Sequence, residues 1–354
     1  MSYRVAINSE KVTFDVLESE SILDGALRNG IGLQHGCRNG QCGTCKAKVN
    51  NGNWRYLDGY TPDILTRSEV DQGMAVSCKA TPQENLNIEL NYPLDEHFDS
   101  RELATTIERI DQLAPDVVRL VLRLPEGETL AYHPGQYINF LLEDGQRRAF
   151  SLAAQPDADC KLEFHIRRVD GGLFTERLFS SLKPGDEICI EGPLGSFRFE
   201  GRSNRPVIFI AGGTGFAPIK SILEGILDKE EDRSIWLYWG VRDSESLYFD
   251  DLPRRWAERH EQFHYVPVVS EPDTGWLGRC GLVHAAVVKD HPDLSEFDIY
   301  MAGPPAMIDV AREVFLAYWH ADERLFCDTF HSGFSPGKKR KSFFRSRLQG
   351  LFTL

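Results

Sequence analysis

The segment Cys37-Arg38-Asn39-Gly40-Gln41-Cys42-Gly43-Thr44-Cys45 concentrates three thiols in nine positions of this 354-residue chain. Its spacing is Cys-x4-Cys-x2-Cys, and Cys78 follows thirty-three residues after the last of them. Converging thiolates are metal ligands, so we take Cys37, Cys42, Cys45 and Cys78 as a candidate metal site. The scatter of the remaining cysteines is unlike a small disulfide-bonded secreted domain. We expect buried structural thiols at Cys160, Cys189, Cys280 and Cys327.

Two kinds of metal site remain open for these four thiols. The four-then-two spacing is that of a plant-type [2Fe–2S] site, in which four thiolates hold two ferric irons. A zinc site usually repeats a Cys-x2-Cys pair instead of opening with a four-residue gap. Gly36, Gly40 and Gly43 favour the cluster, because glycine lets the loop bend until backbone N–H groups face the sulfurs. The segment resembles the loop of plant-type ferredoxins, which implies a β-grasp ferredoxin domain over residues 1–95.

Residues 100–200 show short alternating strands separated by Pro-Gly turns, which predicts a small antiparallel β-barrel. One of these strands is followed by Arg148-Ala149-Phe150-Ser151. A flavin needs a cation near its phosphate, a flat surface beside its ring and a hydrogen bond at N5. Arg148, Phe150 and Ser151 supply these three groups, although an arginine on a barrel strand is commonly just a solvated residue.

Two further elements support a flavin site in the barrel. His165 and Arg167 lie on one predicted strand, and Gly172 and Thr175 open a helix whose N–H groups can hold a pyrophosphate. At this separation the motifs resemble the FAD domain of the ferredoxin–NADP reductase superfamily. That superfamily usually has tyrosine where Phe150 stands, which implies the loss of one hydroxyl contact to the flavin.

Residues 201–330 alternate apolar strands with helical stretches, the pattern of a parallel α/β sheet. One strand runs into Gly212-Gly213-Thr214-Gly215, and we expect a helix from Ile219. Such a turn lets a pyrophosphate approach the backbone, although it also serves as a plain connection. Gly303 and Pro304 end a second strand, and ligands of open parallel sheets bind at those carboxyl ends. The pair resembles the nicotinamide domain of the same superfamily.

The nicotinamide segment departs from its superfamily at Ala302, where most members have cysteine. Flavin reductases and the branch similar to CDP-6-deoxyglucoseen reductase resemble this chain in having alanine there. Asp328 stands where relatives often place glutamate near the flavin. The resemblance therefore implies catalytic roles for Ser151 and Asp328. The alanine at position 302 leaves the rate of hydride transfer open, but not the identity of the cofactor.

The net charge of −13 conceals a basic end, because residues 331–354 hold six basic residues and no acidic one. Subtracting these six positive charges from −13 leaves −19 for residues 1–330, which does not suit nucleic-acid binding. The basic tail can dock a partner or a membrane surface, or it is a solvated end. No stretch approaches the roughly 20 apolar residues of a transmembrane segment. With no apolar signal at the N-terminus, we expect a cytoplasmic protein.

Across residues 1–330, the order ferredoxin, flavin, nicotinamide resembles the single-chain reductases of multicomponent oxygenases. This implies electron transfer from NADH through FAD and a [2Fe–2S] cluster to a Rieske or diiron oxygenase component. A reductase for an iron–sulfur dehydratase of deoxysugar synthesis and a low-turnover redox-sensing or docking protein remain as alternatives. For the donor, Asp243 and Glu245 can repel a 2′-phosphate and favour NADH over NADPH, although Arg242 argues the other way.

Overall fold

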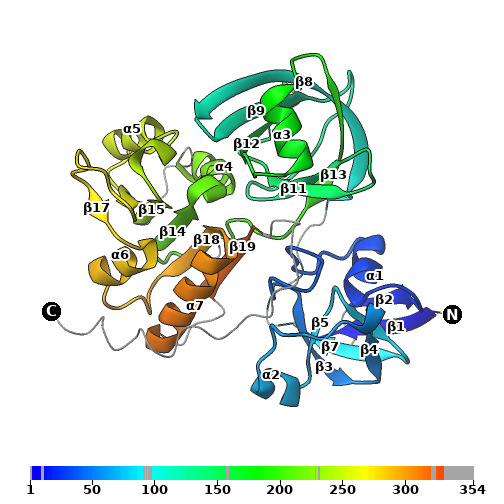
Figure 1. Cartoon of the computed structure of the whole chain (residues 1–354). Coiled ribbons are helices and arrows are strands. Elements are labelled where there is room, and N and C mark those ends of the chain that lie inside the picture. The colour runs from blue at the N-terminus through cyan, green and yellow to red at the C-terminus, as the bar shows by residue number, and fades with distance from the viewer. Residues whose placement is uncertain are drawn as a thin grey trace.

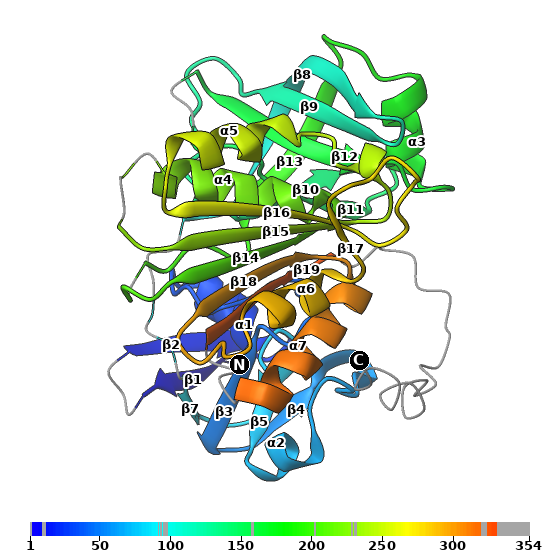
Figure 2. The same ribbon diagram turned by 90° about the vertical axis from the view of Figure 1, so that its left-hand side faces the viewer.

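The computed structural model describes residues 2–8, 12–90, 92, 94, 98–156, 159–201, 203–227, 229, 232–319 and 324–330. Three large sheets divide this part of the chain into an N-terminal unit, a barrel and an α/β unit. Figure 1 shows the N-terminal unit beside the other two, and Figure 2 shows the three as stacked tiers with the α/β unit in the middle. The basic tail, and with it the docking hypothesis, lies outside the described residues.

The N-terminal unit is a five-stranded sheet of order β2-β1-β7-β3-β5, with a separate pair β4-β6. Its strands are β1 (Ser2–Ile7), β2 (Val12–Leu17), β3 (Lys46–Asn51), β4 (Trp54–Tyr56), β5 (Met74–Val76), β6 (Ala80–Pro82) and β7 (Leu86–Glu89). Its helical elements are α1 (Ile22–Arg28), η1 (Leu57–Gly59) and α2 (Arg67–Asp71). The Ser21 side chain caps α1 by accepting from the Asp24 N–H, and Gly30 follows the helix with a φ of 72°.

The barrel is a six-stranded antiparallel sheet of order β11-β10-β13-β8-β9-β12. Its strands are β8 (Arg101–Ala114), β9 (Val117–Arg123), β10 (Tyr137–Leu141), β11 (Arg147–Ser151), β12 (Lys161–Arg167) and β13 (Glu187–Leu194), with helix α3 (Leu173–Ser180) after β12. Alternating apolar side chains fill its interior, where Phe140 contacts the rings of Phe164 and Phe174. The motif Arg148–Ser151 occupies the edge strand β11, which is paired only with β10 among the described residues.

The α/β unit is a six-stranded parallel sheet of order β17-β16-β15-β14-β18-β19. Its strands are β14 (Val207–Gly212), β15 (Ile235–Val241), β16 (Phe263–Val269), β17 (Arg279–Cys280), β18 (Asp298–Gly303) and β19 (Leu325–Thr329). Its helical elements are η2 (Gly213–Gly215), α4 (Phe216–Leu227), η3 (Ser244–Ser246), α5 (Asp251–Arg259), α6 (Val283–Asp290) and α7 (Pro305–Trp319). The chain runs from β14 to β15 on one side and returns to β18 on the other, so the ends of β14 and β18 form a switch point where ligands bind.

Two details of the sequence interpretation need correction. The helix after the glycine-rich turn begins at Phe216 and not at Ile219, because Gly213–Gly215 already form one 3-10 turn. The expectation of buried thiols is wrong for Cys189 and Cys280, which are exposed, while Cys160 and Cys327 are half-buried. Cys189 lies on the outward face of β13, where exposed and buried side chains alternate. No helix among the described residues is long and apolar enough to cross a bilayer.

Candidate functional site

The four predicted metal ligands form two thiol pairs. The Sγ atoms of Cys45 and Cys78 lie 3.2 Å apart. In the other pair the backbone nitrogens of Gln41 and Cys42 each lie 3.3 Å from Cys37 Sγ, and the Cys37 nitrogen lies 3.4 Å from Cys42 Sγ. Two pairs fit a cluster that contains two irons, and the inward N–H groups fit its negative sulfurs.

Each thiol pair favours one ionised member. The hydrogen bond with Cys37 lowers the pKa of Cys42 to about 5, against the opposing effect of burial. The hydrogen bond with Cys78 likewise lowers the pKa of Cys45, whereas the pKa values of Cys37 and Cys78 are raised by the same two bonds. Because the thiolate is the form that binds metal, the lowered pKa values of Cys42 and Cys45 favour the ligating form of one thiol in each pair.

Left-handed backbone and close packing shape the loop around these thiols. Gly40 has a φ of 86°, and a Cβ on it would lie 2.6 Å from the ring of Tyr60, whose hydroxyl donates to the Gly40 carbonyl over 2.6 Å. A Cβ on Gly36 would lie 3.1 Å from Cys42 Sγ. A side chain at either position therefore disturbs the loop, which explains two of the glycines that the sequence interpretation singled out.

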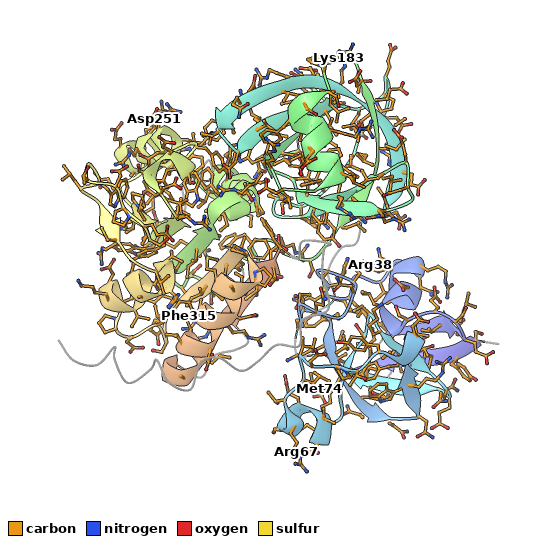
Figure 3. All side chains as sticks on the ribbon, viewed as in Figure 1. Arg38, Arg67, Met74, Lys183, Asp251 and Phe315 are labelled. Atoms are coloured by element: carbon orange, nitrogen blue, oxygen red, sulfur yellow. The ribbon has the colours of Figure 1, made fainter. Side chains whose placement is uncertain are left out.

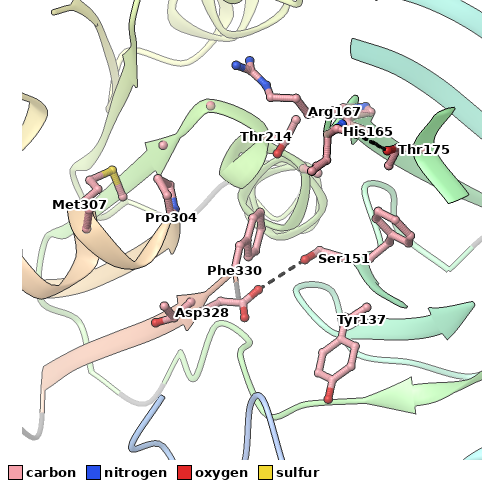
Figure 4. A pocket seen from close by; sticks show the side chains of 18 of the residues that line it. Tyr137, Ser151, His165, Arg167, Thr175, Thr214, Pro304, Met307, Asp328 and Phe330 are labelled. Carbon is pink, nitrogen blue, oxygen red and sulfur yellow. Dashed lines mark hydrogen bonds between the residues drawn. The ribbon is translucent and has the colours of Figure 1, made fainter. Parts of the chain in front are cut away.

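One cavity of about 2440 Å³ joins the barrel, the α/β unit and the cluster loop (Figure 4). Most of the predicted flavin and nicotinamide residues line it: Arg148, Phe150, Ser151, His165, Arg167, Gly172, Thr175, Gly212, Gly213, Thr214, Pro304 and Asp328. The cavity also reaches Gly36 and Cys37. Three motifs that are far apart in the sequence therefore contribute to one wall.

Gly215 and Gly303, also predicted site residues, are absent from that wall and serve packing. A Cβ on Gly215 would lie 2.0 Å from the Ala302 carbonyl oxygen. Gly303 has a φ of 151°, and a Cβ there would lie 3.0 Å from the Gly212 Cα. These two glycines let the ends of β14 and β18 approach each other, which is a different task from contacting a ligand.

Ser151 and Asp328 meet across the boundary between the barrel and the α/β unit. The Ser151 hydroxyl lies 3.4 Å from Asp328 Oδ2, as the dashed line in Figure 4 marks. Burial, with a smaller contribution from the nearby Cys42 charge, raises the pKa of Asp328 to about 7. A carboxyl group with this pKa is partly protonated at neutral pH and can therefore hold a proton beside the Ser151 hydroxyl.

His165 and Thr175 contribute to the wall, but their polar atoms have partners elsewhere. The His165 ring is buried, with Nε2 3.0 Å from Glu163 Oε1 and Nδ1 3.2 Å from the Tyr248 hydroxyl. Burial outweighs the hydrogen bond with Glu163 and lowers the pKa of His165, so the ring is neutral at pH 7. The Thr175 hydroxyl bonds the backbone of Val169.

Arg167 faces the glycine-rich turn. Its Nη1 lies 3.3 Å from Asp116 Oδ2, whereas its Nε and Nη2 are buried with no hydrogen-bond partner among the described residues. A Cβ on Gly213 would lie 3.8 Å from the guanidinium carbon. Trp239 stabilises the turn by donating its Nε1–H to the Gly213 carbonyl over 2.9 Å. Unpaired guanidinium donors beside a glycine-rich turn fit an anionic pyrophosphate.

Three families match this architecture. The 2Fe-2S iron-sulfur cluster binding domain matches residues 5–83, the oxidoreductase FAD-binding domain matches residues 104–199, and the oxidoreductase NAD-binding domain matches residues 209–313. The chain belongs to the iron–sulfur flavoprotein reductases. It is an oxidoreductase with sites for a [2Fe–2S] cluster, FAD and a nicotinamide dinucleotide, and it transfers electrons among them.

Full-length relatives support this membership. The chain is 36% identical over 331 residues to the CDP-6-deoxy-L-threo-D-glycero-4-hexulose-3-dehydrase reductase of Yersinia pestis, covering 93% of this chain and 99% of that protein. It is 31% identical over 332 residues to the xylene/toluene monooxygenase electron transfer component XylA of Pseudomonas putida, covering 93% of each. The Amycolatopsis cytochrome P450 reductase GcoB superposes with a TM-score of 0.78 at 31% identity, over 93% of this chain and 98% of that one.

Some residues of this reductase's cavity were missed in the sequence interpretation. Tyr137, Arg38 and Phe330 all line the cavity, and Figure 4 shows Phe330 beside Asp328. Tyr137 was detectable in principle, because the antiparallel ladder of β10 and β11 pairs it directly with Ser151. Nothing in the local pattern around Arg38 or Phe330 indicates that tertiary packing brings them to the flavin segment.

Proposed function

We propose that this chain oxidises NADH and delivers the electrons one at a time to a protein partner. The observation that carries this proposal is the single cavity whose wall contains Gly212 to Thr214, Ser151 and Cys37. When bound, the nicotinamide supplies a hydride, FAD converts an electron pair into single electrons, and the cluster carries one electron at a time. A continuous cavity brings these three functions within one space.

The chain's own residues receive distinct roles in this proposal. Cys37, Cys42, Cys45 and Cys78 bind the cluster. Arg148 neutralises a flavin phosphate, Phe150 contacts the ring, and the N–H groups of the first turn of α3, after Gly172, bind the pyrophosphate. Ser151 places its hydroxyl at the flavin edge, and Asp328 keeps a proton beside it at neutral pH.

For the dinucleotide we propose that Gly212, Gly213, Thr214 and Pro304 form the turn against which its pyrophosphate lies. Arg167 is better placed for this pyrophosphate than for the flavin, because its unpaired nitrogens lie beside Gly213. His165 and Thr175 act by shaping the wall, and Gly215 and Gly303 act by allowing the two strand ends to pack.

The preference for NADH is supported by the acidic side chains beyond β15. Asp243 and Glu245 line the cavity together with Arg242. Asp243 Oδ1 accepts from the Ser246 N–H and hydroxyl, so its carboxylate is fixed in position. A fixed negative charge there repels a 2′-phosphate. Comparing kcat/KM for the two donors tests this, and a higher value with NADPH than with NADH contradicts it.

For the partner we propose a Rieske or diiron oxygenase component. Relatives of this length include the XylA electron transfer component and the terephthalate 1,2-dioxygenase reductase component 1 of a Comamonas species. A dehydratase of deoxysugar synthesis is the second candidate, which the 36% identity to the Yersinia dehydrase reductase favours. Mixing the NADH-reduced protein with each candidate acceptor and following cluster reoxidation discriminates between them, because the true partner reoxidises it fastest.

We also propose domain limits at residues 1–95, 100–200 and 201–330, and a cytoplasmic location, which is supported because none of the eight cysteines, all within the described residues, forms a disulfide. The experiment that tests the function is anaerobic titration of the purified holoprotein with NADH. Both the flavin and the cluster absorption bands should bleach, and cytochrome c should then be reduced. A protein that holds zinc in place of iron, or that NADH does not bleach, contradicts the proposal. A cytochrome c rate no faster than a flavin-free blank supports a redox sensor instead.

A further inference from the structure

The cluster loop is hydrogen-bonded to the barrel two residues before its first ligand. The Ser196 N–H donates to the His35 carbonyl and the His35 N–H donates to the Ser196 hydroxyl oxygen, each over 2.9 Å. The Gly195 N–H donates to His35 Nε2 over 3.1 Å. Since His35 is buried, and Gly195 and Ser196 are the first two residues after β13, these bonds join residues of two units that are 160 and 161 positions apart in sequence.

Tyr137 makes a second connection at the same place. Its hydroxyl donates to the Gly36 carbonyl over 2.8 Å, immediately before Cys37. In the ladder between β10 and β11, Tyr137 pairs with Ser151. Figure 4 shows Tyr137 next to Ser151, with its hydroxyl directed toward the N-terminal unit. Tyr137 therefore lies opposite Ser151, which is proposed to lie at the flavin edge. The same side chain hydrogen-bonds to Gly36, which directly precedes a cluster ligand.

The surroundings of Tyr137 are built to admit its ring. Gly195 has a φ of 85°, and a Cβ there would lie 2.8 Å from the ring of Tyr137. Arg38, whose charge acts on the Tyr137 hydroxyl, forms an ion pair with Asp24 over 2.6 Å. Figure 3 places Arg38 at the end of the N-terminal unit that faces the barrel, while Arg67 and Met74 lie at its far end. The contact is therefore specific to the cluster end of this unit.

We propose that Tyr137 and Ser196 are positioning residues that hold the cluster loop on the barrel for electron transfer from flavin to cluster. This inference deepens the proposed function and rests on it. Each electron that crosses oxidises the flavin by one equivalent and reduces one ferric iron to ferrous iron. The cluster passes this electron to the protein partner before it accepts the second, so two crossings account for the two electrons of one NADH. The protons go to solvent, and no bond between heavy atoms forms or breaks.

The hydrogen bonds explain why this position matters. They fix the route Ser151, Tyr137, Gly36, Cys37, in which each member is a ladder pair, hydrogen-bond partner or chain neighbour of the next. Loss of one such bond shifts the balance between docked and undocked loop by about fivefold toward the undocked state. Electron transfer across the boundary should slow in proportion to the docked fraction lost.

The test uses the full-length holoprotein and the variants Tyr137→Phe and Ser196→Ala, with Tyr60→Phe as matched control. Tyr60 also donates its hydroxyl to a carbonyl of the cluster loop, at Gly40, but it belongs to the N-terminal unit itself. Backbone hydrogen exchange of peptides covering residues 33–38 and 193–198 reports docking without any turnover. Both test variants should exchange about fivefold faster in these peptides, and Tyr60→Phe should leave residues 193–198 unchanged.

Anaerobic stopped-flow mixing with NADH supplies the second measurement. Flavin bleaching should be unaltered in Ser196→Ala, because Ser196 contacts neither motif of the cavity, while cluster bleaching should slow by at most about fivefold, as the docked fraction falls. Wild-type exchange and wild-type cluster bleaching in both variants overturn the inference and leave the proposed function intact. A wild-type protein in which NADH bleaches neither chromophore contradicts the proposed function instead. Faster exchange without slower bleaching shows that docking does not control the step, and this also overturns the inference.

Discussion

The ammonium group of Lys220 on α4 donates a hydrogen bond to the Ala153 carbonyl of the barrel over 2.8 Å. Lys220 is almost completely buried. Ala153 lies two residues after Ser151, and α4 follows directly from the glycine-rich turn. The same ammonium group lies 3.3 Å from Glu163 Oε1 and 2.8 Å from Glu224 Oε1. This contact therefore links the flavin segment to the nicotinamide segment through one buried charge.

Replacing that charge should destabilise the joint between barrel and α/β unit. In Lys220→Met, the volume is nearly kept but Glu163 is left buried without its cation. We expect a loss of about 3 kcal/mol in the free energy of unfolding, measured with urea. Lys229→Met is the matched control, because Lys229 is an exposed lysine just beyond the same helix and should change stability by less than about 0.5 kcal/mol. Equal effects of the two substitutions would contradict a role for Lys220 at the joint.

The buried charges around Lys220 also predict that the fold is sensitive to acid. Burial alone would raise the pKa of Glu163, but the hydrogen bond with His165 and the charge of Lys220 outweigh it and lower the pKa to about 2. A carboxyl group with a lowered pKa stabilises the fold above its unfolded pKa, and this contribution disappears as the pH falls from about 4.5 toward 2. The shift corresponds to about 3 kcal/mol. In Glu163→Gln, unfolding free energy measured from pH 6 to pH 3 should fall less steeply than in the wild type.

Much of this architecture follows from local sequence, but contacts between distant segments do not. The cysteine spacing, the capped helix after Ser21 and the glycine-rich turn after β14 are determined by residues within a few positions of one another, and the cysteine site and the turn were predicted. The roles of Tyr137 and Lys220 depend on contacts between units, which no local periodicity records. His165 shows the converse, because a histidine on a predicted strand gives no sign that Glu163 and Tyr248 occupy both ring nitrogens.

The two thiol pairs predict what happens when one ligand is removed. Cys78→Ser leaves Cys45 without its partner at 3.2 Å, so the cluster should be lost or strongly depleted. We expect iron content to fall from two per chain toward zero while NADH still bleaches the flavin. Cys189→Ser is the control, since Cys189 is exposed on β13 of the barrel and should retain full iron. Iron retained by Cys78→Ser would mean that Cys78 is not a ligand.

Asp328 should control the step between nicotinamide and flavin through its proton. Its pKa of about 7 means that the protonated form, which can donate to the Ser151 hydroxyl oxygen 3.4 Å away, predominates below neutral pH and is lost above it. The rate of flavin bleaching by NADH should therefore fall as the pH rises from 6 to 8 in the wild type. In Asp328→Asn the profile should be flat, with a rate lower by about tenfold, because the amide cannot exchange a proton with the hydroxyl. Asp328→Glu, which restores a titratable carboxyl group, should recover the pH dependence. A wild-type profile that is flat over this range, or one that survives in Asp328→Asn, assigns the titration to another group and removes Asp328 from the step.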